Sequence, residues 1–182
     1  IGPQGWYLDA ILMGTWFGGD AASNANQSID LDGQGVTASL EGGYPVALSE
    51  NWTLEPQAQL IWQRLSLDDQ ADRYSSVEFD TNDAWTGRIG FRLQGRQETS
   101  VGKLRPYLKA NLWQNFSADQ TVRFATDPIV TDLKGTSLEL GGGLTLDITE
   151  KASLFATADY TTNLGGERSR IWEGNLGLNV KW

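Results

Sequence analysis

Residues that could carry chemistry are few in this 182-residue chain, which contains neither histidine nor cysteine. Catalysis would then depend on paired carboxylates or on a serine and lysine arrangement, and neither occurs at a convincing spacing. Two acidic clusters, Asp30–Asp32 and Asp68–Asp69, lack the ligand spacing of an EF-hand calcium loop and are better explained as acidic loop composition. We therefore predict no catalytic residues, no bound metal, no cofactor and no enzymatic activity.

The net charge of the chain argues against nucleic acid as a partner. The chain carries 14 basic and 23 acidic residues, a net charge of -9. A nucleic-acid phosphate backbone needs a basic face on its protein partner. We expect no nucleic acid among the partners.

Apolar and polar residues alternate with a period of two along the whole chain, and this pattern predicts the strands that carry the polar residues. Trp52, Leu54, Ala58 and Leu60, for example, alternate with Thr53, Glu55, Gln57 and Gln59. Such alternation is typical of strands with one apolar and one polar face. It predicts eight antiparallel strands, at residues 6–17, 36–44, 52–63, 85–94, 104–112, 138–148, 152–160 and 172–182.

Strand length and the polar face favour a membrane barrel over a soluble sandwich. Segments of about nine to eleven residues suit tilted membrane-crossing strands, whereas soluble strands are commonly about five or six. A mean hydropathy of -0.36 is compatible with greasy and polar residues in alternation. The polar face holds Glu41, Glu55, Arg88 and Lys109, which a dry core would not accept without partners. The eight Trp residues suit interfacial girdles, so we predict an all-β, antiparallel, up-and-down transmembrane β-barrel.

The links between these strands alternate in length. Short links are predicted at 47–51, 96–103 and 149–151, and long ones at 18–35, 66–83, 115–136 and 163–170. Outer-membrane barrels have short periplasmic turns and longer outer loops. With the carboxyl terminus on the periplasmic side, every long link falls outside, where we expect mobile polar loops.

Two stretches carry a family resemblance. Leu40-Glu41-Gly42-Gly43-Tyr44-Pro45 and the following Trp52-Thr53-Leu54-Glu55-Pro56-Gln57-Ala58-Gln59-Leu60 resemble the signature of autotransporter β-domains of the AIDA and pertactin type. The ending resembles the terminal strand that the β-barrel assembly machinery recognises, and its signal residues would be Gly174, Leu176, Leu178, Val180 and Trp182.

The resemblance implies a bacterial cell outer membrane location and type V secretion. The domain would anchor an N-terminal passenger and help to translocate it to the cell surface. Its implied partners are outer-membrane lipid, its own passenger segment and the assembly machinery.

The chain departs from the family in strand number. Those barrels have twelve strands and a helix in the lumen, whereas we predict eight strands and nothing helical before Trp6. We interpret residues 1–182 as the C-terminal portion of such a translocator domain. Eight strands also close into a small barrel, so a small outer-membrane barrel with a structural, adhesin or enzymatic role stays open.

The polar candidates for the lumen are Glu41, Glu55, Arg88 and Lys109. In some members of the family, acidic lumen residues help the passenger cleave itself, so Glu41 and Glu55 would form an assisting carboxylate pair. The simpler interpretation, which we favour, is that they line the lumen and pair with Arg88 or Lys109. Parity also places Trp113 and Phe155 on the polar side, and the glycines at 141–143 are expected to make room for neighbours in the lumen.

Overall fold

One antiparallel sheet of long strands forms the body of the protein. The computed structural model describes residues 5–22, 28–30, 32–68, 70–71, 76–81, 83–117, 119–124, 127–132, 134–165 and 169–181. Each strand of the main path pairs with the next one along the chain, in the order β1 (Tyr7–Phe17), β4 (Gly33–Gly43), β6 (Trp52–Leu67), β9 (Ala84–Gly95), β11 (Gly102–Ser117), β14 (Gly135–Thr149), β15 (Ala152–Asn163) and β16 (Arg170–Val180). The predicted eight-stranded, up-and-down architecture is confirmed. No helix in the described part of the chain is long and apolar enough to cross a membrane.

The long links also contain strands, which the sequence analysis did not predict. They are β2 (Asp20–Ala22), β3 (Ser28–Asp30), β7 (Gln70–Ala71), β8 (Ser76–Thr81), β12 (Asp119–Phe124) and β13 (Asp127–Asp132). Four of these form a second sheet in the order β13-β12-β8-β7. The prediction of plain loops was wrong here because these strands have only two to six residues, whereas the sequence analysis sought strands of about nine to eleven. Their backbone groups are satisfied by pairing with one another.

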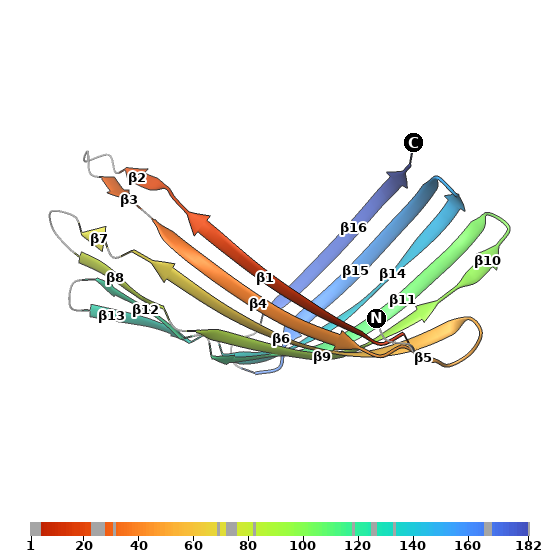
Figure 1. Ribbon diagram of the computed structural model, residues 1–182, viewed down its shortest axis with the longest axis horizontal. Helices are drawn as coiled ribbons and strands as arrows, with labels where there is room; N and C mark the ends of the chain where they lie inside the picture. Colours follow the sequence, from red (N-terminus) through yellow and green to blue (C-terminus); the bar gives the residue numbers. More distant parts are fainter. Residues whose placement is uncertain are drawn as a thin grey trace.

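The two ends of the main sheet differ (Figure 1). At the end drawn on the right lie the short links, which include β5 (Val46–Ala47) and β10 (Gln97–Thr99); we call this the short-turn end. The strands of the long links gather at the opposite end, drawn on the left, which we call the hairpin end. The alternation of short and long links is therefore confirmed.

Strand register sorts the side chains onto two faces. Asp9, Glu41, Gln59 and Arg88 follow one another across β1, β4, β6 and β9, and Arg88 is opposite Trp113 of β11. The polar face is thus made by odd-numbered residues of most strands and by even-numbered residues of β9. Because side chains alternate along a strand, the remaining positions form a continuous apolar face.

Burial on the two faces is the reverse of that in a soluble domain. Among the described residues no hydrophobic side chain is buried, and the buried polar residues are Arg88 and Asn111, which are 9% and 5% exposed. Leu12 is 78% exposed and Leu176 82%. An apolar exterior around a polar interior is stable only when the exterior contacts hydrocarbon.

The sheet is curved but open (Figure 1). In the strand order of the described residues, β1 and β16 stand at the two edges, and each is paired on one side only. This arrangement does not match a closed eight-stranded barrel. Unpaired edge groups are costly in hydrocarbon.

Glycines on the polar face make room for aromatic rings. A Cβ atom at Gly143 would lie 2.6 Å from the carbonyl oxygen of Ala156 and 2.8 Å from Cε1 of Tyr107. The rings of Tyr7 and Phe155 cover Gly43 and Gly177 in the same way. The expectation that the glycines at 141–143 make room for neighbours in the lumen is therefore confirmed for Gly141 and Gly143, whereas Gly142 lies on the apolar face against Leu108.

We predict that Gly143→Ala lowers the stability of the folded protein by about 1–3 kcal/mol, because the added methyl group forces the ring and backbone apart. Urea unfolding in detergent micelles, followed by tryptophan fluorescence, measures the change. Gly174→Ala is the matched control, since the nearest atom to its Cβ would be the Thr157 oxygen at 3.9 Å. Equal unfolding midpoints for the two variants would contradict the steric account.

Candidate functional site

Four side chains singled out in the sequence lie on the polar face of the main sheet. Glu41 is in β4, Glu55 in β6, Arg88 in β9 and Lys109 in β11. They belong to two linked groups of contacts, one around Glu41 and Glu55 toward the short-turn end and one around Lys109 near the middle of β11.

A tyrosine joins the two glutamates. The Tyr7 hydroxyl lies 2.7 Å from Oε1 of Glu41, to which it donates, and 3.5 Å from Oε1 of Glu55. Gln57 donates from Nε2 to Glu55 at 2.6 Å and to the Tyr7 oxygen at 3.1 Å. In strand register Glu41 is opposite Gln59, so the two carboxylates do not face each other directly; Tyr7 brings them together.

Arg88 is the most heavily bonded cation of the site. Its Nη2 lies 3.0 Å from Oε2 of Glu41. Its other nitrogens donate to the amide oxygens of Gln59, Gln57 and Asn111 at 3.0, 3.1 and 3.2 Å. The guanidinium also lies 5.4 Å from the ring centroid of Trp113. These contacts compensate for removing a charge from water.

Lys109 pairs with acids that the sequence analysis did not select. Its Nζ lies 2.5 Å from Oε1 of Glu139 and 2.8 Å from Oδ1 of Asp159. The expectation that the lumen glutamates pair with Arg88 or Lys109 is confirmed for Glu41, which pairs with Arg88, whereas Lys109 pairs with other acids. The reason is register: Lys109 is opposite Gly141, which is itself opposite Asp159, and the lysine side chain lies over that glycine.

Glu139 ties the two groups of contacts together. Its Oε2 accepts from Asn111 Nδ2 at 3.0 Å and from Trp113 Nε1 at 2.7 Å. Because Asn111 also accepts from Arg88, the network is continuous from β1 to β15. Sequence reasoning missed Tyr7 and Glu139, although parity marks both as polar-face residues.

The network as a whole is acidic. Glu41, Glu55, Glu139 and Asp159 outnumber the two cations Arg88 and Lys109. Both carboxylate oxygens of Glu41 are engaged, one by Tyr7 and the other by Arg88. Such a surface offers acceptors to a polar guest and stays wetted, but it leaves Glu41 poorly placed to act as a base.

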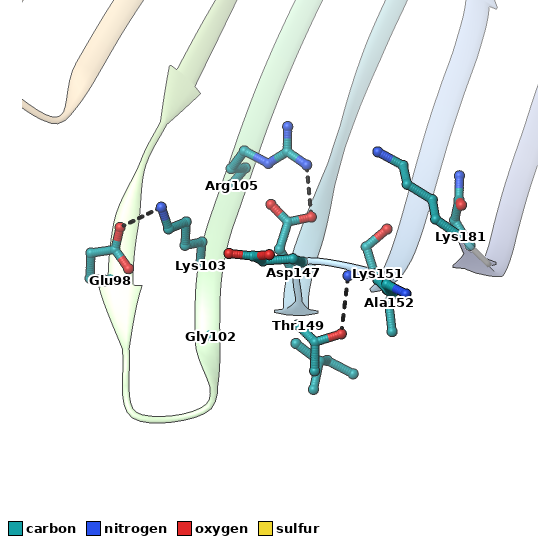
Figure 2. Close-up of a pocket in the computed structure, with 13 residues that line it drawn as sticks. Glu98, Gly102, Lys103, Arg105, Asp147, Thr149, Lys151, Ala152 and Lys181 are labelled. Atoms are coloured by element: carbon teal, nitrogen blue, oxygen red, sulfur yellow. Dashed lines mark hydrogen bonds and ion pairs between the residues drawn. The ribbon is translucent and has the colours of Figure 1, made fainter.

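Cations gather at the short-turn end of the polar face. A cavity of about 650 Å³ is lined there by Lys103, Arg105, Lys151 and Lys181 together with the acids Glu98, Asp147 and Glu150. Figure 2 shows Arg105 paired with Asp147, at 2.9 Å, and Lys103 paired with Glu98, at 3.5 Å. The polar face therefore carries a further group of paired charges at this end.

The predicted assembly-signal residues lie at the edge of the sheet. Gly174, Leu176, Leu178 and Val180 are in β16, which pairs with β15 on one side only. Leu176, Leu178 and Val180 are exposed on the apolar face. Trp182, the last of the predicted signal residues, lies outside the described residues.

An apolar outer face, a charged inner face and long antiparallel strands define a membrane-spanning β-barrel domain of the bacterial outer membrane. The autotransporter β-domain model matches residues 1–159. The chain thus belongs to the autotransporter β-domain family.

Individual relatives agree with this assignment. The pertactin autotransporter of Bordetella bronchiseptica is 31% identical over 100% of the chain, and the BrkA autotransporter of Bordetella pertussis is 27% identical over 100%. The matched region makes up 20% and 18% of those proteins. The chain therefore spans about a fifth of the length of these relatives.

Solved structures share the fold. The crystal structure of the β-domain of the Bordetella autotransporter BrkA matches with a TM-score of 0.67 and 25% identity, covering 100% of this chain and 69% of that one. The transport unit of AIDA-I from Escherichia coli matches with a TM-score of 0.68 and 20% identity, covering 98% and 60%. Both solved domains are longer than this chain.

We predict that Arg88→Gln destabilises the protein by about 3–5 kcal/mol, because it leaves the partly buried Glu41 carboxylate without its cation. The double variant Arg88→Gln with Glu41→Gln is expected to recover part of that loss. Arg105→Gln, which breaks an exposed pair, is the control and should cost less than about 1 kcal/mol. Urea titration tests the set, and strictly additive effects at Arg88 and Glu41 would refute the coupling.

Proposed function

We propose that this chain is part of a translocator domain that anchors an N-terminal passenger in the outer membrane and helps to move it to the cell surface, as in type V secretion. The observation that carries the proposal is the inverted burial, with Arg88 and Asn111 buried while leucines on the opposite face are exposed. Membership of the autotransporter β-domain family supports it.

The open sheet supports a place within a larger barrel. We propose that residues 1–182 form a continuous part of one barrel domain. In the complete domain, β1 and β16 would each pair with a strand from outside this sequence. The solved β-domains, of which the chain covers 69% and 60%, are long enough to contain such strands. Closure would satisfy the backbone groups at both edges.

The acidic network is proposed to contact the passenger segment as it occupies the lumen. Glu41 and Glu55, joined by Tyr7, present acceptors beside Arg88 and Lys109. A guest's backbone N–H groups or basic side chains would bind there through polar contacts. A carboxylate pair that assists passenger cleavage is less well supported, because both oxygens of Glu41 already have partners. We propose no enzymatic activity.

The apolar face and the edge strand β16 are proposed to bind two further partners. Membrane lipid would cover the apolar face, and the β-barrel assembly machinery would recognise β16 through Gly174, Leu176, Leu178, Val180 and Trp182. The exposed edge of β16, which lacks a second neighbour in the described sheet, supports the second assignment.

A surface-display assay tests the proposed function. Residues 1–182 are expressed in a Gram-negative host within their full-length gene product, with an epitope tag in the upstream passenger, and intact cells are treated with external protease. We expect the tag to be accessible on intact cells and lost when β16 is deleted. A correctly folded barrel that never exposes any upstream fusion would refute translocation and favour the small structural or adhesin barrel.

We predict that Leu176→Arg impairs membrane insertion. A basic residue on the lipid face near mid-membrane costs about 2–4 kcal/mol. Asn175→Arg, one residue away on the polar face, is the matched control and should insert normally. The heat-dependent gel mobility of the folded barrel in isolated outer membranes reports insertion. If both variants insert equally well, the assignment of the two faces in β16 is wrong.

A further inference from the structure

Charge is distributed very unevenly on the apolar face. Within the described strands of the main sheet, register and parity place charged side chains on this face only at Arg64 of β6 and Arg170 of β16. Both are at the hairpin end, and each lies two residues beyond a tryptophan on the same face, Trp62 or Trp172. Tryptophan marks the edge of the hydrocarbon, and an arginine just beyond it reaches the headgroup layer.

Two apolar grooves lie on the membrane-centre side of Arg64. The grooves, of about 400 and 510 Å³, share Leu40 and Leu60 as lining residues. The upper groove is bounded by Trp62 and Trp85, which are opposite each other in β6 and β9. Its small lining residues are Ala10 and Ala38, and those of the lower groove include Gly42 and Ala58.

The grooves reach from the interfacial layer into one leaflet. From Trp62 to Ala58 the strand advances roughly 14 Å at about 3.4 Å per residue, which in a strand tilted by about 45° is about 10 Å of depth, or roughly a third of the ~30 Å hydrocarbon thickness. The depression thus runs from the interfacial tryptophans towards the middle of the membrane.

Arg64 lies two residues beyond Trp62, at the interfacial end of this depression. Among the described residues it pairs with Asp83 at 3.8 Å, and both side chains are about half exposed. An exposed guanidinium can bind a phosphate through two parallel hydrogen bonds.

We infer that this part of the outer wall is a binding site for a phosphorylated, acylated lipid of the leaflet on the hairpin side, the outer leaflet. One acyl chain occupies the joined grooves between β1 and β9, and the phosphate binds Arg64. The site combines one cation at the membrane interface with an apolar groove. This combination matches the phosphate and the acyl chain of one amphipathic molecule better than it matches a second protein copy.

Native mass spectrometry of the purified protein in mild detergent tests the site, with lipid A and its dephosphorylated form as probes. We expect the groove-filling double variant Ala38→Leu with Ala58→Leu to weaken lipid A binding by about 10-fold, because leucine side chains fill the slot. Arg64→Gln should weaken it by about 5-fold, the scale of one charge-assisted contact, and should leave binding of the dephosphorylated lipid unchanged.

Two controls separate this site from general lipid contact. Ala158→Leu adds the same side chain to the apolar face outside both grooves, and Arg170→Gln removes the other cation, which is in β16, a strand that lines neither groove. Urea midpoints establish that each variant is folded. The inference is overturned if the groove-filling variant and Arg64→Gln bind lipid A like these controls, or if removing the phosphates leaves the wild-type affinity unchanged.

Discussion

Backbone hydrogen bonding in hydrocarbon is the constraint on which the rest of this structure depends. A membrane interior offers no water to an unpaired N–H or C=O group, so each strand must lie against another along its full length. The register that results, for example Glu41 opposite Gln59 and Gln59 opposite Arg88, fixes which side chains share a face. A shift of one residue in the pairing of a strand would place its charged side chains on the lipid face. The backbone register therefore also determines which side chains line the polar face.

Because the register places most charged side chains on one face, these charges need partners on that face. Its charges are crowded on a curved surface, and burial without partners is costly. Arg88 is partnered by one carboxylate and three amide oxygens, and Lys109 by two carboxylates. Glycines at 90 and 141 allow Asn111 and Lys109 to lie flat against the wall. The partners therefore line the lumen and do not fill it, which is compatible with passage of a guest.

Much of this could be predicted from the sequence, because a period of two with an apolar face is a strong local signal. The eight main strands, their faces and the alternation of link lengths follow from it. The strands β7, β8, β12 and β13 were missed because they have only two to six residues, well below the length of about nine to eleven that a membrane-crossing strand needs. Ion-pair partners were only half predictable: Glu41 and Arg88 are two strands apart, while the partners of Lys109 depend on a register and a glycine that no single segment reveals.

The network and the open edges place different demands on the molecule. The side-chain network begins at Tyr7 in β1 and ends at Asp159 in β15, so its members are all supplied by this chain. The backbone groups at the free edges of β1 and β16 are not satisfied by the described sheet. The two requirements are therefore met in different ways: the side-chain contacts of the polar face are made within the described sheet, whereas the outer backbone edges of β1 and β16 find no partner in it. Because the contacts that hold Arg88 and Lys109 do not involve β16, the charged lining does not depend on how that edge is covered.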